Sequence, residues 1–182
     1  MSAGSVASLN YANRLVTLPL GLTAAALGTV VLPHFSELVS SERWSELSST
    51  IVRYLWKAAL VTIPLGLGLF VFARPLTELL LHRGAFSGAD VATVAGCLAA
   101  LALQIPFYTG VILLMRLALA LKLNAAIALI SFANLALDVG LNAWLASFMG
   151  VTGIALSTSI VYACSFAMLM VVTARRLRQT AA

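Results

Sequence analysis

A single arginine stands near the start of a long apolar run. In the stretch NYANRLVTLPLGLTAAALGTVVLP, residues 10–33, Arg14 is the only charged side chain. An arginine within a membrane segment costs a few kcal/mol and usually faces a cavity or a partner. Because a guanidinium group can bind phosphate oxygens in a bidentate manner, Arg14 and its neighbour Asn13 are candidates for an anion-binding site. The alternative is an interfacial arginine that snorkels to the membrane surface, since Arg14 lies roughly 12 Å from the start of the expected helix.

Asp138 is the only acidic residue in another apolar run, residues 124–148. Asn134 precedes it and Asn142 follows it by four residues each, so the three side chains share one face of a helix. An acid near mid-depth in a membrane helix is a functional candidate. Three roles are open: pairing with Arg14, taking part in cation coupling, or being protonated against a neighbouring helix. The structural alternative is a packing role in which Asn134 is its hydrogen-bonding neighbour.

Other basic residues lie at the ends of apolar runs. Arg116 and Lys122 lie near the end of the run at residues 90–121. Their ordinary role there is to set the topology, and the functional alternative is to attract an anionic lipid headgroup. The arginines within residues 175–178 have the pattern of a stop-transfer cluster.

The residue pattern argues against several other functions. The eleven basic residues give a net charge of +5, but they are dispersed and form no patch for nucleic acid. Cys97 and Cys164 stand alone in separate runs, and neither a metal-ligand spacing nor a nucleophile with a paired base is visible. We therefore expect a transporter that is not an enzyme, with no cofactor, no metal and no nucleic-acid partner. A coupling cation or the membrane potential stays open as its energy source.

The composition indicates an integral membrane protein. Hydrophobic residues make up 62% of the 182 residues and charged residues only 9%. A soluble domain has roughly 45–50% apolar and about 25% charged residues. So few charges could not cover the surface of a soluble protein of this size.

Five apolar runs are each longer than the roughly 20 residues that a helix needs to cross the bilayer. They lack the alternation of barrel strands, so the expected fold class is all-α, a polytopic transmembrane helix bundle. Pro19, Pro64 and Pro106 fall within these runs and predict kinks. The expected helices span residues 6–35, 51–72, 90–121, 124–148 and 151–172, and a short interfacial segment spans residues 75–82.

The charges at the helix ends predict the orientation. With the N-terminus outside and the C-terminus in the cytoplasm, only Arg74 and Arg83 fall on the external side, and Arg14 lies within the membrane. An external start without a signal peptide is unusual for a complete protein, so we expect a segment of a longer chain. The basic residues expected on the cytoplasmic side are Arg43, Arg53, Lys57, Arg116, Lys122, Arg175, Arg176 and Arg178.

The motifs resemble those of a known transporter family. Residues 11–36 contain YANRL, LPLG, ALGT and LPHFS in that order. They resemble the Y-A-D-R-L, L-P-x-G, small-residue and L-P-x-L-S elements of the MurJ (MviN) lipid II flippase family. RGAF at residues 83–86, RLALALK at residues 116–122 and the stretch at residues 134–161 resemble the family's later motifs. The chain is similar to transmembrane helices eight to twelve of a family with fourteen.

The resemblance implies the fold of the multidrug/oligosaccharidyl-lipid/polysaccharide exporter superfamily. In that fold two helical lobes enclose a cavity that opens alternately to each side of the membrane. In the family the cavity is cationic and binds the pyrophosphate and sugar headgroup of lipid II, and its Y-A-D-R-L arginine corresponds to Arg14. Asn13 stands in place of the family's aspartate, which removes a charge that could hold the arginine or respond to protons.

Three functions remain open at this stage. The favoured one is a segment of a lipid II flippase in the bacterial cytoplasmic membrane. Its expected partners are membrane lipids and the missing transmembrane helices, which another chain would supply. The second is a flippase for another polyprenyl-linked saccharide or a small-molecule antiporter. The third is a truncated scaffold without transport activity, because five helices cannot form both lobes. Arg14 favours a phosphate-bearing substrate over a cationic drug.

Overall fold

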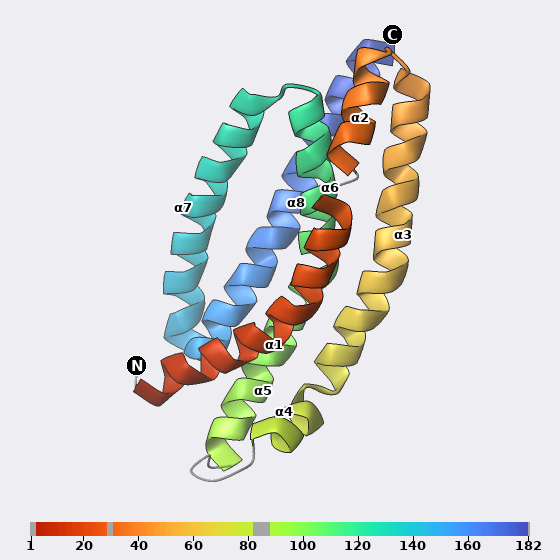
Figure 1. The fold of residues 1–182 in the computed structure, drawn as a ribbon. Helices are drawn as coiled ribbons and strands as arrows, with labels where there is room; N and C mark the ends of the chain where they lie inside the picture. The colour runs from red at the N-terminus through yellow and green to blue at the C-terminus, as the bar shows by residue number, and fades with distance from the viewer. Residues whose placement is uncertain (1–2, 29–30, 82–87, 182) are drawn as a thin grey trace.

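The computed structural model describes residues 3–28, 31–81 and 88–181, and within these ranges every regular element is a helix. The helices form an elongated bundle (Figure 1), which confirms the all-α class. The eight helices are α1 (Ala3–Gly28), α2 (Val31–Ser40), α3 (Trp44–Val71), α4 (Ala73–Leu81), α5 (Gly88–Ala102), α6 (Gln104–Ala120), α7 (Asn124–Met149) and α8 (Val151–Ala181).

Four helical stretches in the described part of the chain are long and apolar enough to cross a membrane. They are α3, the consecutive pair α5 and α6, α7, and α8 over Val151–Thr180. The expected fifth span, residues 6–35, corresponds to α1 and the start of α2 and is less apolar, because Asn10, Asn13 and Arg14 occupy its first half. The number of spans is therefore approximate, while the multi-pass helical character is clear.

Helix ends differ from the expected ranges for local reasons. α3 begins at Trp44 rather than at residue 51. The mostly polar residues 44–50 form the first turns of this helix, and these turns are amphipathic and bury Leu47. The run at residues 90–121 is divided at Leu103 into α5 and α6. Pro106 has no N–H to donate to the carbonyl of Ala102, which accounts for the division. The helices continue through Pro19 and through Pro64.

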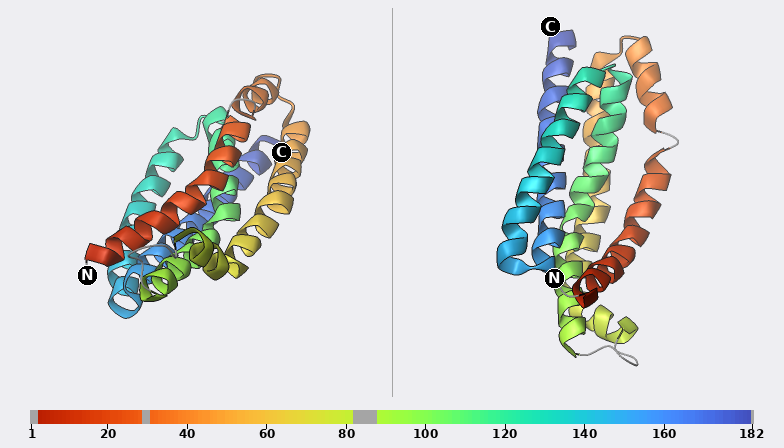
Figure 2. Two further views of the ribbon diagram at one scale, coloured as in Figure 1. Left: turned by 60° about the horizontal axis from the view of Figure 1, so that its bottom comes forward. Right: turned by 90° about the vertical axis from the view of Figure 1, so that its left-hand side faces the viewer.

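α8 is the helix on which the other long helices assemble. It packs against α5, α6 and α7, whereas α7 contacts only α8 and α6 among the described helices. α1 crosses α5 and α6, and α3 packs on α5 and α6 (Figures 1 and 2). α1 and α7 make no contact with each other over the described residues.

Two apolar clusters fill the bundle. One joins α2, α3, α6 and α8 around Phe35, Leu114 and Leu169. The other joins α1, α5 and the start of α8 around Val16 and Leu98. A bridging hydrogen bond supports the second cluster, because the buried Ser159 hydroxyl on α8 donates to the Ala100 carbonyl on α5 at 2.6 Å.

The turns place the basic residues unevenly along the bundle. The α2–α3 turn, the α6–α7 turn and the C-terminal end of α8 lie at one end of the bundle, and α4 and the α7–α8 turn lie at the other (Figure 1). The first end therefore carries Arg43, Lys122 and the arginines of residues 175–178, which the sequence assigned to the cytoplasmic side, whereas Lys57 of that set lies at the middle of α3. α4 covers the expected interfacial segment and carries the Arg74–Glu78 ion pair at 3.0 Å. Arg83 and residue 82 lie outside the described residues.

The α7–α8 hairpin depends on two glycines. Gly150 ends α7 with a φ of 59°, a conformation that glycine adopts without strain. Gly153, in the first turn of α8, is buried against the backbone of Leu145 so closely that a methyl group there would overlap the Leu145 carbonyl. By contrast, a methyl group on Gly140 in α7 would meet open space.

We expect Gly153→Ala to destabilise the protein, because the Leu145 carbonyl is backbone and cannot rotate away. Overpacking of this kind costs about 1–3 kcal/mol. The measurement is the midpoint of thermal unfolding in detergent.

The matched control is Gly140→Ala, which adds the same methyl group to the facing helix. It should leave the midpoint unchanged or raise it, because alanine is the better helix former by about 1 kcal/mol. Equal midpoints for the two variants would contradict the close α7–α8 packing.

Candidate functional site

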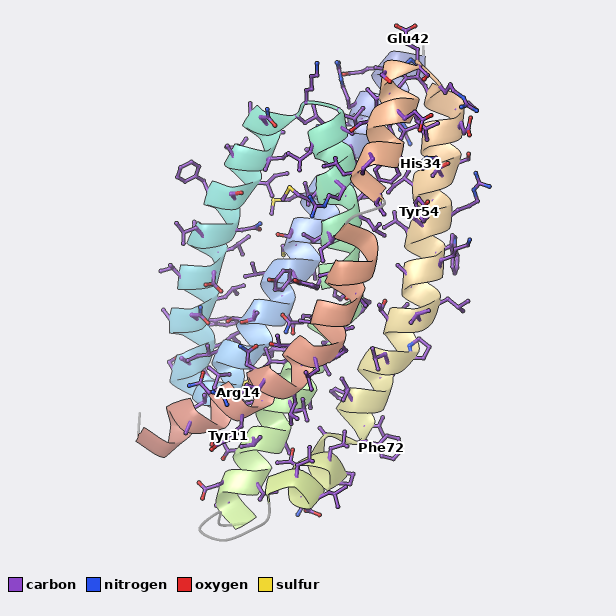
Figure 3. All side chains as sticks on the ribbon, viewed as in Figure 1. Tyr11, Arg14, His34, Glu42, Tyr54 and Phe72 are labelled. Carbon is purple, nitrogen blue, oxygen red and sulfur yellow. The ribbon has the colours of Figure 1, made fainter. Side chains whose placement is uncertain are left out.

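The face of α1 that carries Arg14 points away from the bundle. Ser8, Ala12, Val16 and Leu20 recur every four residues and are buried, mainly against α5. Successive helical residues are about 100° apart, so Arg14, two residues from Ala12 and from Val16, lies on the opposite side of α1 from this stripe. Arg14 and Asn13 are both exposed. Figure 3 shows Arg14 on the N-terminal half of α1, near the end of the bundle that also holds α4.

Arg14 has no ion-pair partner within the described parts of the chain. The ion pairs found there are Arg43–Glu46 and Arg74–Glu78, both within single helices. Asn13 contributes only its backbone carbonyl, which accepts a hydrogen bond from the Thr17 hydroxyl at 2.7 Å. An exposed guanidinium group without a carboxylate partner is able to bind an anion.

Arg14 and Asp138 lie in separate parts of the structure. Arg14 is on α1 and Asp138 is on α7, and these two helices do not contact each other over the described residues. The pairing of Asp138 with Arg14, one of the three roles considered from the sequence, is therefore not formed here. Arg116 is half-buried on a third helix, α6.

Polar side chains gather instead along the contact between α7 and α8. Asn134 donates through Nδ2 to the Ser165 hydroxyl, and the Ser157 hydroxyl donates to Asn142 Oδ1. Asp138 lies between the two asparagines on the same face of α7. We call this group the α7–α8 polar seam; it comprises Asn134, Asp138, Asn142, Ser157, Thr158, Tyr162 and Ser165.

A pocket of about 340 Å³ opens in the middle of the seam. Its walls include Asn134 and Asp138 from α7 and Thr158 and Tyr162 from α8. Asn134 Oδ1 is buried without a hydrogen-bond partner among the described residues. The Thr158 hydroxyl donates to the Ile154 carbonyl at 3.1 Å, which leaves its oxygen lone pairs available. The pocket thus presents oxygen acceptors with one carboxylate among them.

The sequence identified one side of the seam and missed the other. The four-residue spacing of Asn134, Asp138 and Asn142 indicated their common face. The partners on α8 were considered only as small residues that permit close packing. The hydroxyl groups of Thr158 and Tyr162, also four residues apart, were the available signal. Tyr162 is held by an edge-to-face contact with Tyr108 of α6, with ring centroids 5.2 Å apart.

No group of three or more His, Cys, Asp and Glu side chains that could hold a metal ion occurs in the described ranges. Cys97 is buried and Cys164 is half-buried, and both are free thiols. The Cys97 sulfur lies 3.9 Å from the Thr152 hydroxyl.

The sequence matches one family model along its whole length and known relatives along much of it. The family model described as "Lipid II flippase MurJ" matches residues 1–182. The "Probable lipid II flippase MurJ" of Thermotoga maritima is 32% identical over 173 residues, which cover 93% of this chain and 35% of the relative. The "Lipid II flippase MurJ" of Burkholderia cenocepacia is 36% identical over 118 residues, which cover 65% of this chain and 22% of the relative.

A solved structure has the same fold. It is titled "Lipid II flippase MurJ, inward closed conformation" and superposes with a TM-score of 0.78 at 25% identity. The match covers 93% of this chain and 36% of the solved chain. The matched part of the chain thus covers between 22% and 36% of the length of these proteins. The family match over the full sequence, the relatives and the shared fold together establish that this multi-pass membrane chain belongs to the lipid II flippase MurJ family.

Proposed function

We propose that this chain is part of a flippase that moves lipid II, an anionic lipid-linked saccharide, across the bacterial cytoplasmic membrane by alternating access. The observation that carries the proposal is Arg14, an exposed cation on α1 that has no ion-pair partner among the described residues of this family member. Its guanidinium group matches the pyrophosphate of such a substrate. The exposed face of α1 is then one wall of the substrate cavity.

The other walls of that cavity come from helices outside this chain. α1 uses its buried stripe to pack on α5, so its Arg14 face is left for further helices or for substrate. A complete cavity of two lobes needs the helices that correspond to the rest of the family's length, supplied by another chain or another part of the same protein. In this arrangement the N-terminus lies outside and the C-terminal arginines lie in the cytoplasm, following the uneven distribution of basic residues.

The α7–α8 polar seam is proposed as the coupling-cation site. Asp138 supplies one negative charge, and Asn134 Oδ1 and the Thr158 hydroxyl supply neutral oxygen atoms in the same pocket. Hard cations prefer oxygen ligands of this kind. With one carboxylate, a monovalent cation such as Na⁺ leaves the half-buried site neutral, whereas a divalent cation leaves it charged. The orphaned Asn134 oxygen gains a partner when the cation binds.

Transport activity is testable by grafting. Residues 1–182 replace the matching segment of the full-length Burkholderia cenocepacia relative, and the chimaera is expressed in cells depleted of their own lipid II flippase. We expect the chimaera to restore growth and Arg14→Ala to abolish it, because the substrate phosphates lose a charged donor. Growth and the translocation of labelled lipid II are measured.

Arg74→Ala is the control for that experiment, since Arg74 lies on the interfacial helix α4 and should be dispensable. Membrane abundance of each chimaera is measured by immunoblot, so that loss of growth is compared only between inserted proteins. Full rescue by the Arg14→Ala chimaera would refute the role of Arg14. Translocation of a different polyprenyl-linked saccharide in place of lipid II would refute the substrate.

Cation binding is testable on the purified chain. A ligand at 100 times its Kd stabilises the folded state by about 2.7 kcal/mol, or roughly 5–10 °C for a chain of this size. We expect Na⁺, compared with choline at equal ionic strength, to raise the unfolding midpoint by this amount. Asp138→Asn and Thr158→Val should abolish the rise, because each removes an oxygen ligand or its charge.

Glu37→Gln, at an exposed position on α2, should keep the full Na⁺ effect and serves as the control. A rise that persists in Asp138→Asn would place the cation elsewhere. A midpoint that responds to pH but not to Na⁺ would mean that Asp138 binds a proton and not a metal cation.

A further inference from the structure

An apolar groove runs between α3 and α8 with α6 as its floor. Its volume is about 550 Å³. Only two lining residues, Ser48 and Thr173, carry hydroxyl groups, and both donate to the backbone of their own helices, at 2.9 Å and 2.7 Å. Apart from the indole N–H of Trp56, the groove therefore offers apolar surface, which fits a hydrocarbon occupant.

The groove is open because α3 packs on α6 and barely on α8. Its floor is formed at Gly110 of α6, where the ring of Phe166 from α8 occupies the space that a side chain would fill. Phe107 packs beside Phe166, with ring centroids 6.2 Å apart. These contacts hold α6 and α8 together while α3 remains separated from α8.

The dimensions of the groove suit one acyl chain. Along α3 its lining extends from Ser48 to Ile63, roughly 22 Å at 1.5 Å per residue. One leaflet of the hydrocarbon core is about 15 Å deep, so the groove can hold a chain that reaches from the headgroup level to the midplane.

A polar pocket follows at the end of the groove. Its lining includes Ser49 of α3 and Thr180 of α8, which lie next to Ser48 and one turn beyond Leu177 of the groove. The pocket has a volume of about 610 Å³ and carries Glu42, Arg43 and Glu46. Figure 3 shows Glu42 at the α2–α3 turn, at the same end of the bundle as the C-terminus.

The charges of the pocket match a zwitterionic headgroup. Arg43 is a donor for a phosphate, and its ion-pair partner Glu46 and the neighbouring Glu42 are acceptors for an ammonium group. Phosphatidylglycerol has no ammonium group to pair with the two carboxylates that line the pocket, so it matches the lining less well. Trp44 lines the same pocket, and tryptophan is enriched at the depth of lipid headgroups.

We propose that this groove and pocket form a binding site for one glycerophospholipid with a phosphoethanolamine headgroup, taken from the surrounding bilayer. One acyl chain lies between α3 and α8, and the headgroup lies at Arg43, Glu42 and Glu46. The lipid fills the gap between the two helices and so fixes their separation. The site is at the opposite end of the bundle from Arg14 and is independent of the proposed transport substrate.

The test is lipid binding to the purified, delipidated chain. Phosphatidylethanolamine or phosphatidylglycerol with identical acyl chains is added, and bound lipid is counted by native mass spectrometry. We expect one tightly bound phosphatidylethanolamine and weaker binding of phosphatidylglycerol. Ala59→Phe, which fills the groove from α3, should weaken binding about tenfold, the effect of losing roughly two buried methylene contacts.

Leu60→Phe is the matched control, because Leu60 is adjacent to Ala59 but points away from the groove with 73% of its surface exposed. Ala174→Phe fills the groove from α8 and replaces Ala59→Phe if that variant does not fold. The double variant Glu42→Gln, Glu46→Gln should shift the preference toward phosphatidylglycerol. Equal lipid binding by Ala59→Phe and Leu60→Phe would overturn the proposal, and so would equal affinity for the two lipids in the unaltered chain. Retention of a polyprenyl-linked lipid in place of phosphatidylethanolamine would overturn it as well.

Discussion

The close packing of α8 against its neighbours is the constraint on which the rest of the structure depends. Lipid provides little hydrophobic driving force between helices, so association relies on van der Waals contact and interhelical hydrogen bonds. Gly153 lets α8 approach the end of α7, and Ser159 ties α8 to α5 through the Ala100 carbonyl. Because α5, α6 and α7 all pack on α8, these small side chains set the positions of the helices that carry the functional residues.

Polar side chains in this bundle differ in whether their hydrogen bonds are complete within the described residues. The hydroxyl groups of Thr62, Thr109 and Thr173 donate to the backbone of their own helices and leave no requirement for a partner. The α7–α8 polar seam differs, because its hydrogen bonds leave Asn134 Oδ1 buried without a partner in the described part of the chain and place Asp138 in the same pocket. A buried acceptor of this kind is costly unless a ligand satisfies it. The seam is therefore the place where a ligand would satisfy an unpaired buried acceptor.

The three surfaces proposed to bind ligands lie on different helices. Arg14 is on α1, the seam is between α7 and α8, and the apolar groove is between α3 and α8. α8 borders the last two, so occupation of either site bears on the same helix. The proposed lipid between α3 and α8 and the proposed cation between α7 and α8 would both contact α8 and so influence how the helices move together. Rigid-body motion of helical lobes is the basis of alternating access.

The sequence by itself determined the membrane class, the helical fold, the family and the candidate residues Arg14, Asp138 and Asn134. These follow from hydropathy, helical spacing and residue type, which are local properties of the chain. Only the tertiary structure decided that Arg14 and Asp138 do not meet, that Asn134 binds Ser165, and that Thr158 and Tyr162 complete the pocket. Likewise, only the structure revealed the groove between α3 and α8. The physical reason is that contacts between apolar helices depend on the positions of small side chains and single hydrogen bonds. Long helices such as α5 and α7 have several faces apolar enough to be the contact.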